Sequence, residues 1–484
     1  MAGNPNPPRK LLVVITSYGT NQDKYLEKLA QEYQKMPYLV HVVVVSNVAK
    51  PVPGGVELVV GLPTKAPWSL PFAHKKIMAD RVNDYDLFIY SENDTMVSER
   101  NIEAFLRVSK VLPTTDIPGF LRYEEGPGGL RNYINLHGHY HWDPSSPCKH
   151  GPYIFASLTN EHSACYLLTR KQLQHAVDSG GFLVPPYQGK YDLACTASTD
   201  PYTRCGFRKL ICISHLDDFV VHHLPDKYTG PNFDPCSQAF QKQLDVLLSI
   251  GKNGKRPSTL IETETKLPAA MFSKDYYEPV RQEVVSAIPS SIRSILSLGC
   301  GSGETERWLA ARGLRVTAVP LDPVIGACLE GSGIELVCGD FAAVREQLEE
   351  HKFDCLFLSN ILHLLPNPQE MLSEFSELLM PGGYLLLVSP NLVNLKTQYY
   401  KLMGKSGYRR LDNFEESGVQ KVSKRKMEEW FRNARCKVET IKYIAAPRVE
   451  NVSRYIPLAL RYVVSTEIIV LGKKTMAYGE VKNC

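Results

Sequence analysis

The deciding stretch of the sequence is Ile295-Leu-Ser-Leu-Gly-Cys-Gly-Ser-Gly-Glu304. A short apolar run ends in glycines at positions 299, 301 and 303, and residues 305–311 continue with helical character. Because glycine has no Cβ, a strand that turns through G-x-G-x-G into a helix brings bare backbone close to a ligand. The stretch therefore predicts a strand, a tight ligand-binding turn and a helix.

Further apolar runs follow the glycines at the spacing of strands that alternate with helices. They lie at residues 315–323, 334–340, 353–366 and 381–390, and a helix is predicted over about 369–380. This alternation predicts a parallel, doubly wound α/β sheet with its ligand at the carboxyl ends of the strands.

Residues 271–484 resemble a class I S-adenosylmethionine-dependent methyltransferase. The glycine loop, Gly339-Asp340 and the turn Met380-Pro-Gly-Gly-Tyr-Leu-Leu-Leu387 stand where that family places its motifs. The resemblance implies S-adenosylmethionine as the cofactor. It also implies contacts to the cofactor from Gly299, Gly301, Gly303, Asp340 and Asn360, the last of them touching the amino acid moiety.

Two positions depart from the family pattern. The family has an acid where this chain has Ser297, and another at the end of the second strand, where this chain has Pro320. Proline offers no side-chain acceptor, so we expect Asp322 to contact the ribose. The alternative is a domain that has lost the cofactor and only supports structure.

The first half of the chain is also predicted to be α/β. Strands are expected at residues 11–17, 40–46 and 56–60, with helices at 22–34 and 71–82. The next strand, Leu87–Asp94, ends in Glu92 and Asp94. Acids two positions apart face the same side of a strand, where they could hold Mn²⁺ or Mg²⁺. A solvated acidic turn is the plainer interpretation.

Residues 10–250 resemble a GT-A-fold glycosyltransferase, with Glu92 and Asp94 as its D-x-D-like motif. The resemblance implies a nucleotide-sugar donor, a glycan or glycoconjugate acceptor and a divalent metal that neutralises the departing diphosphate. The implied nucleoside contacts are Thr16, Ser46 and Asn47. The implied late metal ligand is His222 or His223. The implied carboxylate bases are Asp217, Asp218 and Asp192.

Other residues carry weaker hypotheses. The run Asn132–Trp142 could line an acceptor groove, and its alternating His137, His139 and His141 fit one face of a polar strand better than a metal trio. A hydroxyl methyl acceptor would need a base, for which His363 is the first candidate. The segment 272–288 resembles the helical lid that precedes the glycine loop in methyltransferases.

Composition limits the classes of function. A chain of 484 residues exceeds one ordinary core, so two domains are expected. A net charge of +4, with 44% hydrophobic and 22% charged residues, favours a soluble protein with no nucleic-acid partner. Neither a signal peptide nor a transmembrane segment is predicted, and the twelve cysteines suit free thiols in the cytoplasm. Peripheral membrane contact and oligomeric state stay open.

The domain order suggests a bifunctional enzyme. The hypothesis assigns residues 1–250 to sugar transfer, 251–270 to a linker and 271–484 to methylation, with a hydroxyl on the transferred sugar as the candidate methyl acceptor. Two alternatives remain. The N-terminal half could only bind a glycan or nucleotide beside a methyltransferase, or the C-terminal half could be an inactive scaffold for a glycosyltransferase.

Overall fold

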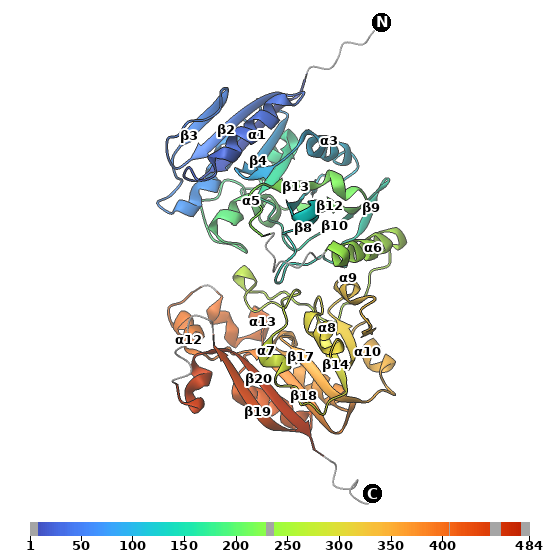
Figure 1. Ribbon diagram of the computed structural model, residues 1–484. Coiled ribbons are helices and arrows are strands. Elements are labelled where there is room, and N and C mark those ends of the chain that lie inside the picture. Colours follow the sequence, from blue (N-terminus) through green and yellow to red (C-terminus); the bar gives the residue numbers. More distant parts are fainter. Residues whose placement is uncertain (1–7, 229–236, 406, 446–455, 476–484) are drawn as a thin grey trace, which may run out of the picture. The chain divides into compact units, whose positions relative to one another are not determined.

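The computed structural model describes residues 8–228, 237–405, 407–445 and 456–475. Contacts between residues divide the chain into two compact units. One comprises Met1–Leu136 with Tyr140–Lys255, and the other comprises His137–His139 with Arg256–Cys484. Each unit is built around its own β-sheet (Figure 1).

The first unit contains a five-stranded sheet in the order β11-β4-β1-β2-β3. Its strands are β1 (Lys10–Ser17), β2 (Leu39–Ser46), β3 (Val56–Val60), β4 (Leu87–Glu92) and β11 (Cys165–Thr169). The first four are mutually parallel, and β11 runs antiparallel to β4. The side chains of Leu11–Ile15 and Val42–Val45 are buried, as expected of parallel strands covered on both faces.

Helices and two smaller sheets complete the first unit. The helices are α1 (Asp23–Lys35), α2 (Ala73–Asp80), α3 (Glu99–Val108), α4 (Arg170–Asp178), α5 (Leu193–Thr203) and α6 (Ser237–Asn253). One small sheet joins β6 (Asp116–Pro118), β12 (Arg208–Cys212), β10 (Tyr153–Ala156) and β9 (Cys148–His150). The other joins β5 (Thr95–Met96), β13 (Val220–His223), β7 (Leu121–Glu125) and β8 (Arg131–Tyr133). Strand β5 begins directly after Asp94, and its pairing sets His223 of β13 opposite Thr95, so this second sheet brings β13 beside the predicted acidic motif.

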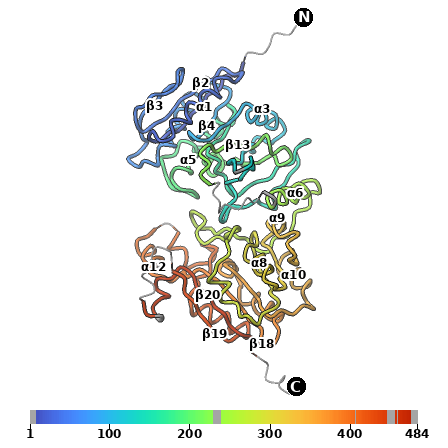
Figure 2. The backbone as a smooth tube through the Cα atoms, in the orientation of Figure 1, coloured from blue at the N-terminus to red at the C-terminus, as the bar shows by residue number. Residues whose placement is uncertain are grey.

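The second unit is organised on a seven-stranded sheet in the order β16-β15-β14-β17-β18-β20-β19. The strands are β14 (Ser294–Cys300), β15 (Arg315–Pro320), β16 (Glu335–Leu336), β17 (Phe353–Ser359), β18 (Leu379–Pro390), β19 (Cys436–Ala445) and β20 (Ser465–Lys474). The first five are parallel, and β20 pairs antiparallel with both β18 and β19. Figure 2 shows the backbone of these last three strands side by side. The predicted doubly wound sheet is confirmed.

Short helices flank this sheet. They are α7 (Gln282–Val285), α8 (Glu304–Ala310), α9 (Pro323–Gly326), α10 (Phe341–Gln347), α11 (Pro368–Ser376), α12 (Leu395–Leu402), α13 (Phe414–Ser417) and α14 (Lys424–Asn433). In α14, Met427, Trp430 and Phe431 form a buried stripe at helical spacing. None of the helices in the described part of the chain combines the length and apolar character that a membrane crossing requires.

Candidate functional site

The end of β4 places Asp94 opposite a histidine from a distant strand. Asp94 Oδ2 lies 3.6 Å from His223 Nε2, and both side chains are almost fully buried. Although burial alone would favour the neutral acid, the hydrogen bond and charge of His223 lower the pKa of Asp94. Burial likewise favours neutral imidazole, but Asp94 and Glu124 raise the pKa of His223. The structure therefore brings together two of the four predicted metal ligands.

Glu124 orients this histidine. Its Oε1 lies 2.6 Å from His223 Nδ1, and its carboxylate also accepts the backbone N–H groups of Lys227 and Tyr228 at 3.1 and 2.7 Å. With Nδ1 engaged by the carboxylate, Nε2 is left facing Asp94. A carboxylate that fixes one imidazole nitrogen so that the other faces outward is the usual support of a metal-binding histidine.

The other two predicted ligands lie elsewhere. Glu92 Oε1 is 3.4 Å from His162 Nε2. His222 stacks on Tyr123 with ring centroids 4.9 Å apart, because successive residues of a strand point to opposite faces. Among the described residues, no group of three or more His, Cys, Asp or Glu side chains is arranged to hold a metal ion alone.

The predicted nucleoside contacts lie at the carboxyl ends of β1 and β2, but local bonds engage them. Thr16 Oγ1 is 3.1 Å from the Tyr90 hydroxyl. Asn47 Oδ1 accepts the Gly19 N–H at 2.7 Å, and Ser46 Oγ accepts the Val48 N–H at 3.3 Å.

A lysine that the sequence did not single out also lies at this edge. Lys50 Nζ donates to Ser17 Oγ at 2.6 Å, Gly19 O at 2.8 Å and Asp23 Oδ1 at 2.6 Å. Ser17 also accepts a bond from Asn93, between the two acids. Lys50 thus ties the ends of β1 and β4 to the start of α1.

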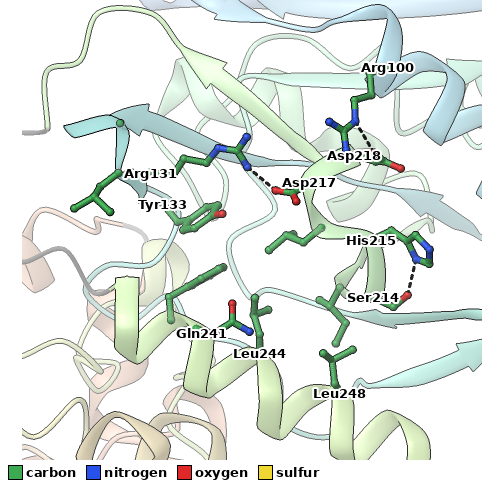
Figure 3. Close-up of a pocket in the computed structure, with 15 residues that line it drawn as sticks. Arg100, Arg131, Tyr133, Ser214, His215, Asp217, Asp218, Gln241, Leu244 and Leu248 are labelled. Carbon is green, nitrogen blue, oxygen red and sulfur yellow. Dashed lines mark hydrogen bonds and ion pairs between the residues drawn. The ribbon is translucent and has the colours of Figure 1, made fainter. Parts of the chain in front are cut away.

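Asp217 and Asp218, the predicted bases, line a different feature. They belong to a short 3₁₀ helix, Ile213–Asp218, on the wall of a groove of about 870 Å³. Figure 3 shows Arg131 directed at Asp217 and Arg100 at Asp218, with Leu244 and Leu248 of α6 nearby. The two ion pairs measure 2.6 Å each.

This groove does not contain the metal candidates. Asp218 lies five positions before His223, the last residue of β13, a span of at most about 17 Å of extended chain. The assignment of Asp217 or Asp218 as the base that deprotonates the acceptor stays a prediction, and each acid is engaged by an arginine in this groove. The third candidate, Asp192, caps α5 by accepting the Cys195 N–H at 2.8 Å.

In the second unit, the glycine loop has the predicted strand-turn-helix form. Gly299 and Gly303 adopt φ of +76° and +83°, a region that side chains disfavour. A Cβ on Gly303 would lie 2.2 Å from Leu329 Cδ2, and one on Gly301 would lie 2.1 Å from the Tyr276 carbonyl oxygen. The atoms that pack closely against these two glycines therefore belong to Leu329 and Tyr276 of the same chain.

Residues 296–387 match the family model described as "Methyltransferase domain". The C-terminal unit carries a methyltransferase domain. One curated relative is the ubiquinone biosynthesis O-methyltransferase of Xylella fastidiosa strain 9a5c, 34% identical over 120 residues, which are 23% of this chain and 48% of the relative. The protein of the same description from Coxiella burnetii strain Dugway 5J108-111 is 27% identical over 133 residues, 26% of this chain and 56% of that protein. The chain spans about half the length of the curated relatives it matches.

Similar solved structures include two S-adenosylmethionine-dependent methyltransferases. The one from Archaeoglobus fulgidus is 17% identical, with a TM-score of 0.30, over 40% of this chain and 91% of that chain. The one from Mesorhizobium loti is 16% identical, with a TM-score of 0.29, over 40% of this chain and 96% of that chain.

Ser297 stands where the methyltransferase pattern has an acid, and in the structure the carboxylate of Glu306 lies beside it. Ser297 Oγ donates to Glu306 Oε1 at 2.6 Å, and the Glu306 side chain is buried beneath the glycine loop. Burial raises the pKa of Glu306. Sequence reasoning missed this acid, although its position in the first turn after the glycines was a usable signal.

The other predicted cofactor residues of the methyltransferase domain act as local supports. Asp322 Oδ1 caps α9 by accepting the N–H groups of Val324 and Ile325 at 2.8 and 3.0 Å. Asp340 is exposed and caps α10 through the Ala343 N–H at 2.9 Å. A cap leaves further acceptor capacity on each carboxylate.

Asn360 follows β17 with a positive φ of 52°. Its side-chain amide donates to Glu278 and Glu467, each at 3.1 Å. The predicted contact to a cofactor need not replace either bond, because Asn360 Oδ1 accepts no hydrogen bond from the described residues.

His363 is not placed as a solvent-facing base. Its side chain is buried, and its Nε2 lies 2.7 Å from the Phe272 carbonyl oxygen. Burial lowers the pKa of His363 to about 4. In this conformation the imidazole is covered and bonded to the Phe272 carbonyl, so the assignment of His363 as a base stays a prediction that requires it to be uncovered.

The crevice at the glycine loop does not fit S-adenosylmethionine in this conformation. The space bounded by Lys274, Glu278, the loop and Ser359 amounts to about 20 Å³, room for about one water molecule. The predicted helical lid is also different, because residues 273–281 form no helix and α7 has only four residues. Binding of S-adenosylmethionine at this loop would therefore need residues 273–281 to move.

Proposed function

We propose that the C-terminal unit transfers a methyl group from S-adenosylmethionine to a hydroxyl acceptor. The observation that carries this proposal is the match of residues 296–387 to the methyltransferase model, on a sheet whose glycine loop follows the parallel strand β14. The two curated relatives named above are O-methyltransferases by description. S-adenosylmethionine supplies an electrophilic methyl group, and the domain would orient the acceptor and exclude water.

Binding of the methyl donor tests this proposal. Calorimetric titration of the full chain with S-adenosylmethionine is expected to show one saturable site. No heat at millimolar donor from the native chain or from its Tyr276→Phe variant would favour the inactive-scaffold alternative and remove the methyltransferase proposal.

We further propose that the N-terminal unit is a GT-A-like glycosyltransferase that uses a divalent metal and a nucleotide sugar. The pair Asp94–His223, supported by Glu124, carries this second proposal. Two protein ligands suffice where substrate phosphates and water complete the coordination of Mg²⁺ or Mn²⁺. This is why the absence of a three-ligand group among the described residues is compatible with such a site.

Together the two proposals describe a bifunctional enzyme of glycan or glycoconjugate biosynthesis. The domain assignment is residues 1–250 for sugar transfer, 251–270 as a linker and 271–484 for methylation. Carrying both activities on one chain raises the effective concentration of a shared intermediate at the second site. If the N-terminal unit only binds a nucleotide or glycan, methylation would be the single activity.

The Asp94→Asn variant tests the metal site. In native protein, uridine or guanosine diphosphate with Mn²⁺ is expected to raise thermal stability, by about 2.7 kcal/mol at about a hundredfold excess over the dissociation constant. Asp94→Asn is expected to abolish the Mn²⁺-dependent part, because it removes the anionic ligand. The measurement is a thermal-shift titration of each nucleotide with and without the metal.

The matched control is Asp217→Asn, which alters an exposed acid in the other groove. It is expected to retain the native response. An Asp94→Asn variant that responds to Mn²⁺ and nucleotide like native protein would remove the proposed metal site.

A further inference from the structure

One segment of the second unit lies across the ends of three strands. We call residues 260–278 the cover segment. The Leu260 N–H donates to Leu321 O, just after β15, at 2.8 Å, and Tyr276 O accepts the Ser302 N–H, just after β14, at 2.6 Å. Lys274 Nζ donates to Ser359 O, the last residue of β17, at 2.9 Å. Ligands of open α/β sheets bind at these carboxyl ends, so the cover segment occupies the ligand position.

Tyr276 holds the carboxyl-terminal part of the cover segment in place. Its side chain is 3% exposed, and its hydroxyl is 3.1 Å from Thr263 Oγ1. Burial first, and then the negative charge of Asp322, raise the pKa of Tyr276, which places the ring near the acid expected to contact ribose. Its carbonyl oxygen lies where a Cβ on Gly301 would collide with it. The ring and its backbone thus fill the nucleoside side of the crevice.

Lys274 occupies the other side. Its ammonium is buried, with the side chain 1% exposed, and it bonds Glu278 Oε2 at 2.7 Å as well as Ser359 O. S-adenosylmethionine also carries cationic groups, an ammonium and a sulfonium. The crevice therefore already holds an aromatic ring and a buried cation supplied by the chain.

We propose that the cover segment is an intramolecular competitor of the methyl donor, which can bind only after residues 273–278 leave the glycine loop. This inference rests on the proposed methyltransferase function. When a binding-competent state is only a fraction of the population, the apparent affinity falls by that fraction. Loosening the cover segment must then strengthen donor binding. If the segment instead held the bound donor in place, loosening it would weaken donor binding.

The Tyr276→Phe variant tests whether loosening the cover segment raises or lowers the affinity for the methyl donor. It removes the hydroxyl that meets Thr263 while keeping the ring, and a hydrogen bond of this kind contributes about 2- to 10-fold to an equilibrium. We expect S-adenosylmethionine to bind this full-length variant about 2- to 10-fold more tightly than native protein, measured by calorimetry. Thr263→Val removes the same bond from the other partner and is expected to give the same direction.

The control is Tyr384→Phe, which removes a hydroxyl from the middle of β18, where Tyr384 pairs with Cys355. It is expected to bind the donor like native protein. Amide hydrogen exchange gives a second readout, and residues 273–278 are expected to exchange faster when the donor is bound.

Equal or weaker binding by both loosened variants, or slower exchange of residues 273–278 on binding, would overturn the competitor role while leaving the methyltransferase proposal intact. Binding by a loosened variant alone would support both. The absence of binding by native protein and every variant would overturn both.

Discussion

Replacing Glu124 with alanine is expected to lower the free energy of unfolding by about 3–5 kcal/mol, the cost typical of breaking a buried charge pair. The Glu124 side chain is fully buried and meets His223 Nδ1 at 2.6 Å. Its loss leaves the imidazole beside Asp94 without its partner and opens a cavity. Urea unfolding followed by tryptophan fluorescence measures the change, since Trp142 is buried in the same unit.

The same variant is expected to weaken Mn²⁺ binding by about 10- to 100-fold, because carboxylates that orient metal-binding histidines contribute to this degree. Glu124→Gln is the matched control. It keeps the volume and one acceptor oxygen, and should cost about 1 kcal/mol. If Glu124→Ala unfolds like native protein, the description of Glu124 as the buried support of His223 is contradicted.

Replacing Gly301 with alanine is expected to destabilise the second unit by about 1–3 kcal/mol, as overpacking a close contact does. The added Cβ would lie 2.1 Å from the Tyr276 carbonyl oxygen and 2.9 Å from its Cα. These are backbone atoms, so the strain cannot be relieved by turning a side chain. The measurement is thermal unfolding by circular dichroism, with increased proteolysis of the cover segment as a local readout.

Gly54→Ala is the control for Gly301→Ala. A Cβ at Gly54 meets no atom within 4 Å, and its φ lies outside the left-handed region. It is expected to unfold within about 0.5 kcal/mol of native protein. Equal stability of Gly301→Ala and Gly54→Ala would show that the Tyr276 backbone does not rest on the glycine loop.

Local patterns in the sequence were sufficient to predict the sheet of the second unit. The apolar run before Gly299 and the run after Gly383 each sit inside the strand they predict, β14 and β18. Both patterns depend on neighbours within a few residues.

The parts that the sequence did not predict depend on partners far apart in the chain. Glu124 and His223 are separated by 99 positions, and Lys274 and Ser359 by 85. No local pattern indicates such pairs. Residues 273–278 illustrate the consequence, because they were expected to belong to a helical lid and instead form hydrogen bonds with distant strand ends.

Amide hydrogen exchange at the glycine loop, with and without S-adenosylmethionine, tests the central claim most directly. The account predicts that residues 299–303 exchange more slowly when the donor is bound, because the donor packs against this backbone. Unchanged exchange of residues 299–303 at saturating donor would contradict the assignment of this loop as the methyl-donor site.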